Sequence, residues 1–293
     1  MASDLVRFTN ERGDRLVGRL DAPDVRTPCA YALFAHCFTC SKDLRAVETI
    51  SRSLGRRGIA VLRFDFTGLG ESEGEFAETN FSSNVEDLIA AAEFLEREHR
   101  APAIAIGHSL GGAAVLQAAG RLDSVEAVAT IGAPADPEHV AHIFQDERET
   151  IEETGEATVR IAGRSFTIRK QFLDDLEATR MNEAIGSLGR ALLIMHSPRD
   201  GIVEIENAER IYRAARHPKS FVSLDTADHL LTDRTDAAYA AQVIASWSEK
   251  YVQPLPSPTE GEDAHQAVVH TGESGYRTEI ETGGHALVSD EPE

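Results

Sequence analysis

The stretch Gly107-His108-Ser109-Leu110-Gly111 decides the fold of this 293-residue chain, because of the segments on either side of it. The apolar run Ala103-Ile104-Ala105-Ile106 comes before it and predicts a short buried strand, and residues 113–119 after it favour a helix. A serine between two glycines at a junction from strand to helix is typical of a nucleophile elbow. Glycine is needed there because such a tight turn leaves no room for β-carbons. Ser109 is therefore the candidate nucleophile.

Strand and helix patterns alternate along the rest of the chain. Residues 5–20 alternate around a turn and predict an opening hairpin. Strands that alternate with helices imply an α/β fold, in which helices flank a mostly parallel central sheet on right-handed crossovers. Further strands are predicted at residues 31–35, 59–64, 127–131, 191–195 and 220–224, and helices at residues 46–56, 84–98, 206–215 and 236–251.

The alternation breaks at about residues 134–185. This segment contains a polar helical stretch, a predicted hairpin of residues 158–161 and 165–168 that turns at Ala162-Gly163, and a further helix. We interpret it as a cap insertion over the carboxyl edge of the sheet, where it would shape a substrate pocket. Its basic side chains would be available to an anionic substrate, although a solvated hairpin face explains them more simply: Arg160, Arg164, Arg169 and Lys170.

A serine nucleophile needs a histidine to remove its proton and a carboxylate to orient that histidine. Asp200 follows the predicted strand 191–195, and His229 follows the predicted strand 220–224. The chain order of serine, aspartate and histidine is that of α/β-hydrolases, not that of chymotrypsin-like or subtilisin-like enzymes. We therefore predict that Ser109, Asp200 and His229 form a catalytic triad.

Four other residues compete for the roles of base and acid. His108 neighbours the nucleophile, where its side chain should point away, and His196 is expected under the site. Asp225 is an alternative acid, and so is Asp228, which is badly placed to face the ring of the adjacent His229.

The tetrahedral intermediate of acyl transfer needs backbone N–H donors for its oxyanion. Leu110, directly after the nucleophile, should supply one of them. The other should come from the loop His36-Cys37-Phe38-Thr39 after the strand 31–35, with Phe38 as the first choice and Cys37 as the second.

These residues, together with residues 63–72 (Arg-Phe-Asp-Phe-Thr-Gly-Leu-Gly-Glu-Ser), resemble the α/β-hydrolase superfamily over roughly residues 5–251. The resemblance implies a hydrolase domain at residues 1–251, in which the Asp-x-x-Gly-x-Gly-x-Ser turn shapes the sheet edge. More narrowly, residues 36–43 and 80–87 resemble the hydrolase half of bacterial two-part proteins. Those proteins fuse an α/β-hydrolase to an OsmC-like (osmotically inducible protein C) peroxide-reductase domain.

Residues 252–293 are an acidic linker and a short tail, with nine acidic side chains and one basic one, Arg277. Residues 268–293 resemble the opening strands of an OsmC-like domain, as if such a domain were truncated. No cysteine follows Cys40, so the peroxidase activity of OsmC-like proteins is not implied. A dimerising hairpin, a truncation scar and disorder are the alternatives for the tail, and the first would make the protein a homodimer.

Composition limits the partners. The formal net charge of −20 argues against nucleic acid and against anionic membranes, since both need clustered basic side chains. No apolar run approaches the roughly 20 residues of a membrane span, and no secretory signal opens the chain, so we expect a cytoplasmic location. The expected partner is a small-molecule ester, with no metal and no cofactor.

Three cysteines lie within twelve positions of one another, at Cys29, Cys37 and Cys40. The spacing Cys-x-x-Cys of the last two matches redox and zinc sites, but zinc would need further ligands, and His36 is the one close histidine. We expect these cysteines to be small buried thiols with a structural role.

The leading hypothesis is a serine hydrolase that cleaves carboxylic esters of small to medium acyl chains through an acyl-enzyme. A thioesterase, a lactonase or a small peptidase would use the same triad. Two hypotheses come from other classes: a redox module built on Cys37 and Cys40, and a hydrolase fold that serves as a non-catalytic binding or dimerisation module.

Overall fold

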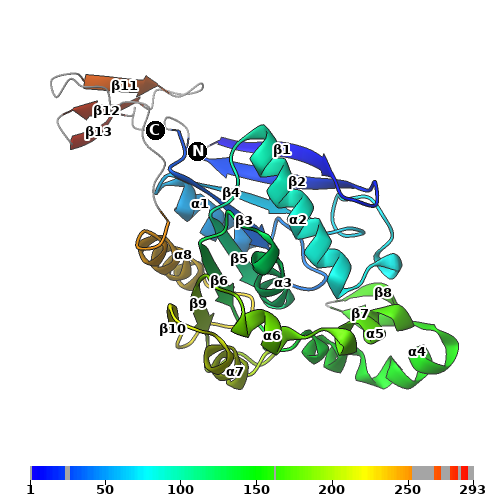
Figure 1. Ribbon diagram of the computed structural model, residues 1–293. Coiled ribbons are helices and arrows are strands. Elements are labelled where there is room, and N and C mark those ends of the chain that lie inside the picture. Colours follow the sequence, from blue (N-terminus) through cyan, green and yellow to red (C-terminus); the bar gives the residue numbers. More distant parts are fainter. Residues whose placement is uncertain are drawn as a thin grey trace.

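A computed structural model of the chain describes residues 2–23, 27–161, 163–252, 267–271, 278–282 and 285–289. Eight strands form one sheet in the order β1-β2-β4-β3-β5-β6-β9-β10, in which β1, β2 and β4 pair antiparallel and the rest pair parallel (Figure 1). The predicted α/β fold with a mostly parallel sheet is thus confirmed. The strands are β1 (Ala2–Thr9), β2 (Arg15–Ala22), β3 (Ala30–Ala35), β4 (Ile59–Phe64), β5 (Ile104–His108), β6 (Ala127–Ile131), β9 (Ala191–His196) and β10 (Lys219–Ser223).

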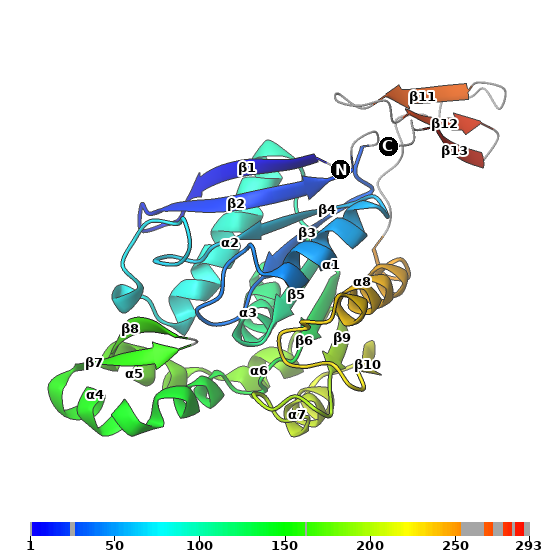
Figure 2. The ribbon, with the colours of Figure 1, turned by 180° about the vertical axis from the view of Figure 1, so that it is seen from behind.

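Helices cover both faces of this sheet (Figures 1 and 2). One face packs on α1 and α8, and the other packs on α2, α3 and α7. The sequence of strand β3 is apolar throughout because both of its faces are buried. Ala32 and Phe34 face α1 and α8, while Leu33 and Ala35 face α2, α3 and α7. A parallel strand that is buried on both faces has no solvent-exposed face on which polar side chains would lie. The helices are α1 (Arg45–Gly55), α2 (Phe81–Glu98), α3 (Leu110–Ala118), α7 (Glu206–Ala214) and α8 (Arg234–Ser248).

The predicted insertion lies between β6 and β9 and forms a cap at one end of the sheet (Figure 1). Its hairpin, β7 and β8, is confirmed, although Ala162 of the predicted turn lies outside the described residues. The cap contacts the main domain through α2, where the Asp175 carboxylate accepts hydrogen bonds from the Ser82 amide and hydroxyl at 2.8 and 2.6 Å. The cap elements are η3 (Pro137–Glu147), α4 (Arg148–Thr154), β7 (Glu156–Ile161), β8 (Arg164–Arg169), α5 (Lys170–Ala178) and α6 (Met181–Gly186).

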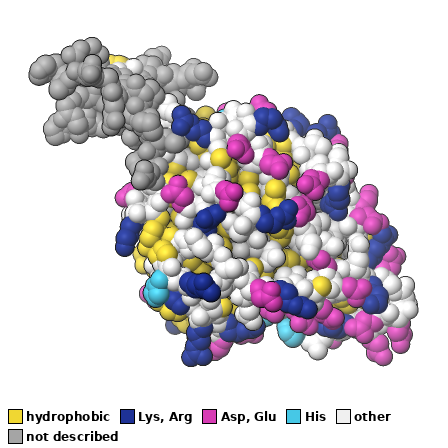
Figure 3. All heavy atoms as spheres, viewed as in Figure 1, with side chains coloured by type: hydrophobic (Ala, Val, Ile, Leu, Met, Phe, Trp, Pro, Cys, Tyr) yellow, Lys and Arg dark blue, Asp and Glu magenta, His cyan; other side chains and the backbone are white. Residues whose placement is uncertain are grey.

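Two of the four basic side chains that the sequence marked in the cap are paired with acidic ones, while Arg164 contacts the Thr39 carbonyl and the Phe166 ring. Arg169 forms ion pairs with Glu156 and with Glu78, and Lys170 pairs with Asp174. On the face shown in Figure 3, blue and magenta side chains are interspersed in this way. Arg169 and Lys170 therefore belong to a solvated, self-neutralising surface, as the sequence suggested.

Three short strands form a separate antiparallel sheet in the order β11-β12-β13. They are β11 (Ala267–Thr271), β12 (Thr278–Thr282) and β13 (His285–Ser289). Apart from Val252, the predicted acidic linker lies outside the described residues, and so do residues 272–277, 283–284 and 290–293 of the predicted OsmC-like segment. Among the helices of the described ranges, none has both the length and the apolar character needed to cross a bilayer.

A buried ion pair joins two strands of the sheet. Arg63 on β4 donates from Nε to Asp21 Oδ2 on β2 at 2.6 Å, and the two side chains are 3% and 0% exposed. Its Nη1 also donates to the Lys42 carbonyl at 2.7 Å, which ties the loop after β3 to the sheet. Burying two charges is costly, and their mutual attraction offsets that cost only while both partners are present.

We therefore expect Arg63→Met to lower the free energy of unfolding by about 3–5 kcal/mol, because it leaves the Asp21 carboxylate buried without a counter-charge. Urea denaturation followed by circular dichroism measures this. Arg19→Met is the matched control, since Arg19 makes a looser pair with Asp43 at the surface, and its loss should cost under about 1 kcal/mol. Equal effects of the two substitutions would contradict the assignment.

Candidate active site

Ser109 has the backbone of a nucleophile elbow. Its φ of 55° and ψ of −128° are rare for a residue with a side chain, and such strain persists only where the surroundings impose it. A β-carbon on Gly107 would lie 2.3 Å from the Gly111 carbonyl oxygen, and one on Gly111 would lie 2.4 Å from that of His36. The two glycines are therefore required by space, as the sequence predicts.

The structure brings Asp200 and His229 together. The imidazole Nδ1 lies 2.7 Å from Asp200 Oδ2, while Asp200 Oδ1 accepts hydrogen bonds from the amides of Ile202 and Val203 at 2.9 and 3.0 Å. Burial raises the pKa of Asp200, but the hydrogen bonds from His229 and the two amides outweigh it, so the pKa lies below its ordinary value. The carboxylate therefore stays charged and accepts the Nδ1 proton of His229.

The end of β6 places Ser109 near this pair. The Ser109 amide donates to the Ile131 carbonyl at 2.9 Å. A β-carbon on the next residue, Gly132, would lie 3.1 Å from Asp200 Oδ2 and 3.4 Å from His229 Nδ1. Among the hydrogen bonds of the described residues, none joins the Ser109 hydroxyl to the His229 imidazole.

His108 and His196 support the pair and do not compete with it. His108 Nε2 lies 2.6 Å from the His229 carbonyl oxygen, and His196 Nε2 lies 2.7 Å from that of Val203. A carbonyl can only accept, so both nitrogens carry hydrogen. Burial, then the neighbouring His229, lowers the pKa of His108 to about 3, and burial also lowers the pKa of His196. Both rings are therefore neutral, and one of them holds the backbone of His229.

The alternative acids are placed elsewhere. The Asp228 carboxylate accepts hydrogen bonds from the amide and hydroxyl of Thr232. Within the described part of the chain, neither Asp228 nor Asp225 makes a side-chain hydrogen bond to the His229 ring. Asp200 is the carboxylate that the geometry selects.

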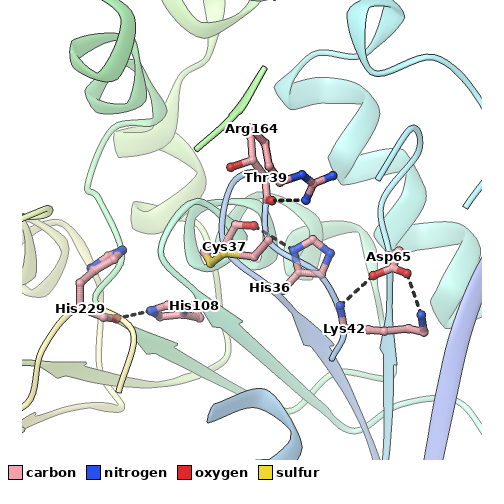
Figure 4. The surroundings of a disulfide bond; sticks show 9 residues. His36, Cys37, Thr39, Lys42, Asp65, His108, Arg164 and His229 are labelled. Atoms are coloured by element: carbon pink, nitrogen blue, oxygen red, sulfur yellow. Dashed lines mark hydrogen bonds and ion pairs between the residues drawn. A yellow bond between two sulfur atoms is a disulfide. The ribbon is translucent and has the colours of Figure 1, made fainter. Parts of the chain in front are cut away.

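The loop after β3 contains a disulfide between Cys37 and Cys40 (Figure 4). The expectation that Cys37 and Cys40 are thiols is therefore wrong, because the turn brings their two side chains together. The Cys40 amide donates to the Cys37 carbonyl at 3.1 Å, and Thr39 has a φ of 60°. A separation of three positions across a backbone turn of this kind places the two β-carbons within reach of one disulfide bond.

The backbone amides of Phe38 and Leu110 can still donate hydrogen bonds near the elbow. Neither takes part in a hydrogen bond among the residues that the structure describes, and both residues line one cavity. The cavity is walled by the loop after β3, the first turn of α3 and a group of aromatic rings, and it is mostly apolar. Its lining residues are His36, Cys37, Phe38, Thr39, Phe66, Leu69, Phe76, Asn84, Leu110, Gly111 and Ala114.

A buried lysine that sequence reasoning missed anchors the other end of this loop. Lys42 is 1% exposed, and its Nζ lies 2.8 Å from Asp65 Oδ2 and 2.6 Å from Glu71 Oε2. Asp65 Oδ1 also accepts a hydrogen bond from the Lys42 amide at 2.7 Å. The turn at residues 65–72 therefore does more than shape the sheet edge: it fixes the Lys42 end of the loop that carries Phe38. A lysine close to that aspartate motif is the signal that could have revealed this contact.

The family model of the alpha/beta hydrolase family matches residues 32–293. The chain belongs to this family. An esterase domain from a Rhodothermus marinus protein is 54% identical to this hydrolase, covers 86% of it with 100% of its own chain, and superposes with a TM-score of 0.72.

Two curated proteins are more distant. The Escherichia coli protein YfhR is 23% identical over 248 residues, which are 83% of this hydrolase and 80% of YfhR. The mouse mitochondrial palmitoyl-protein thioesterase ABHD10 is 37% identical over 92 residues, which are 31% of this chain and 29% of that protein.

The elbow predicts the effect of adding one methyl group. In Gly111→Ala the new β-carbon would meet two backbone oxygens, at 2.4 and 2.5 Å, so we expect a loss of about 1–3 kcal/mol or more in unfolding free energy. Gly120→Ala is the control, because a β-carbon there meets nothing within 4 Å, and its stability should stay equal or rise slightly. Thermal unfolding of both variants measures this, and a stable Gly111→Ala protein would contradict the packing.

Proposed function

We propose that this hydrolase cleaves carboxylic esters of small to medium acyl chains through an acyl-enzyme on Ser109. The observation that carries the proposal is the Asp200–His229 contact of 2.7 Å beside a serine in a strained elbow. The likeness to an esterase domain at 54% identity supports the ester as substrate.

The geometry assigns a role to each residue of the proposed triad. Asp200 accepts the Nδ1 proton of His229, which leaves the Nε2 lone pair free to take the proton of the Ser109 hydroxyl. The Ser109 oxygen then attacks the ester carbonyl, and the same imidazole returns the proton to the departing alcohol. A water molecule, activated by His229 in turn, releases the acid from Ser109.

The amides of Leu110 and Phe38 are the proposed oxyanion donors, with the amide of Cys37 as the alternative to that of Phe38. Donors aimed at the developing charge are worth most where water is excluded. Burial of Leu110 and Cys37, at 3% and 4% exposure, supports this site.

The apolar cavity beside these amides supports an apolar acyl group. The Phe38 ring lies 5.8 Å from that of Phe76 and 5.5 Å from that of Phe172 in α5. The Phe166 ring of β8 lies 4.9 Å from that of Phe76, so the cap helps to close this side of the pocket. Rings packed in this way limit the length of the acyl chain that fits.

A thioester is the second candidate substrate, because the segment shared with the thioesterase ABHD10 is 37% identical. The same triad would cleave it, with a thiol as leaving group in place of an alcohol. A cytoplasmic location, a homodimer through the tail and an OsmC-like origin of β11–β13 remain predictions from the sequence.

Removal of the nucleophile tests the proposal. We expect Ser109→Ala to lower kcat for p-nitrophenyl butyrate by about 10³-fold or more, and Asp200→Asn to lower it by roughly 10⁴-fold through the wrong imidazole tautomer. Mass spectrometry after a fluorophosphonate probe should show one adduct, on Ser109. Asp228→Asn is the matched control and should stay within about twofold of wild type, since that carboxylate is exposed and bonded to Thr232. Full turnover by the Ser109→Ala protein would refute the proposal.

The pocket makes a second prediction. Phe76→Ala should make room for about two more methylenes, and at about 0.8 kcal/mol each this corresponds to roughly a tenfold rise in the octanoate-to-butyrate ratio of kcat/KM. Phe221→Ala, at an exposed position on β10, is the control and should leave the ratio unchanged. An unchanged ratio in Phe76→Ala would show that the acyl chain binds elsewhere.

A further inference from the structure

The Cys37–Cys40 disulfide encloses a residue of the proposed catalytic machinery. Phe38 and Thr39 lie between the two cysteines, and the amide of Phe38 is the proposed oxyanion donor. The turn is closed twice, by the sulfur–sulfur bond and by the hydrogen bond from the Cys40 amide to the Cys37 carbonyl at 3.1 Å. The direction of the Phe38 amide is therefore set inside a small covalent ring.

Other contacts fix the two ends of the loop and leave its middle to the disulfide. On one side, His36 Nδ1 lies 2.8 Å from the Cys37 carbonyl oxygen. On the other side, the Lys42 side chain is held by the Asp65 carboxylate at 2.8 Å. At the tip, Arg164 of the cap reaches the Thr39 carbonyl only at 3.5 Å, the limit of a hydrogen bond (Figure 4). Thr39 also has a φ of 60°, a backbone conformation that its branched side chain disfavours.

The two cysteines differ in their exposure to solvent. Cys37 is buried, at 4% exposure, whereas Cys40 is partly exposed. An external thiolate would therefore reach the Cys40 sulfur first. The motif does not open a helix, because α1 starts at Arg45, so a thioredoxin-like activity of its own is not what this arrangement offers.

We propose that Cys37–Cys40 is a thiol–disulfide exchange site for a dithiol reductant, and that its reduction lowers the turnover of the hydrolase by releasing the Phe38 amide. This inference rests on the proposed function. The disulfide would then be a modification site that controls stabilisation of the oxyanion. Substrate binding depends on the aromatic pocket and should not change on reduction.

A dithiol supplies the two electrons and two protons that reduction of the disulfide requires. One of its thiolates attacks Cys40 Sγ, the bond between the two protein sulfurs breaks, and Cys37 leaves as a thiolate that takes up a proton. The second thiol of the reductant, as its thiolate, then attacks the reductant sulfur that is bonded to Cys40 Sγ. This releases Cys40 as a thiolate, which also takes up a proton. The protein gains two electrons and two protons, and the reductant becomes a cyclic disulfide.

The experiment compares the oxidised and reduced full-length protein. Dithiothreitol reduces one sample and is removed by gel filtration under nitrogen, and iodoacetamide with mass spectrometry reports the state of each cysteine. Kinetics with p-nitrophenyl butyrate should show kcat falling by about tenfold on reduction with KM within about twofold, since complete loss of one oxyanion donor costs about 10²–10³-fold. Reoxidation in air should restore kcat.

Two variants separate this effect from others. The double variant Cys37→Ser with Cys40→Ser should have the low kcat of the reduced protein and ignore dithiothreitol, while Cys29→Ser, which leaves the disulfide intact, should respond as wild type does. Equal kcat in the oxidised and reduced protein would overturn the inference, and so would a loss of activity that coincides with loss of the near-ultraviolet circular dichroism. The Ser109→Ala protein is the blank: if the oxidised wild type turns over no faster, the proposed function itself fails.

Discussion

The contact on which the site depends is the approach of α3 to the end of β3, which is too close for any side chain. Even a β-carbon on Gly111 would lie 2.4 Å from the His36 oxygen and 2.5 Å from that of Ala35. Because α3 starts here, Leu110 lines the same cavity as the loop after β3. One steric constraint therefore brings the elbow and the loop of the second proposed oxyanion donor together, and the central strands supply the rigid frame that enforces it.

Buried charged side chains hold the loop after β3 in place. The loop after β3 leaves the sheet, and no ladder of hydrogen bonds holds it. Asp65 replaces that ladder by accepting from the Lys42 amide and Nζ, while Arg63 donates to the Lys42 carbonyl. Burying these charges adds little net stability, since desolvation cancels much of the attraction. What the cluster contributes is a single position for the end of the loop at Lys42, because any other position would leave a buried charge without its partner.

The sequence predicts those parts of the site that depend on local rules. Ser109 is recognisable because an elbow needs glycines at fixed spacing, and Asp200 was preferred to Asp228 because adjacent side chains cannot face one another. Lys42 was missed because nothing in its own neighbourhood marks a lysine for burial; its partner lies 23 residues further along the chain. The disulfide was missed for a related reason. The spacing of Cys37 and Cys40 permits a bond, but only the turn at Thr39 brings the sulfurs together.

The buried histidines near the site are neutral, because burial lowers their pKa values. His36 and His108 lie close to the elbow and His196 lies near Asp200; burial is the first cause that lowers the pKa of all three. They are neutral beside the proposed triad, so an imidazolium that formed on His229 during the proposed attack would meet the Asp200 carboxylate without a positive charge on these three rings. His108 can then act as a donor to the His229 backbone without opposing the charge on its ring. A lysine or arginine in that position would supply the same hydrogen bond, but its charge would disfavour the imidazolium at a ring 5.0 Å away.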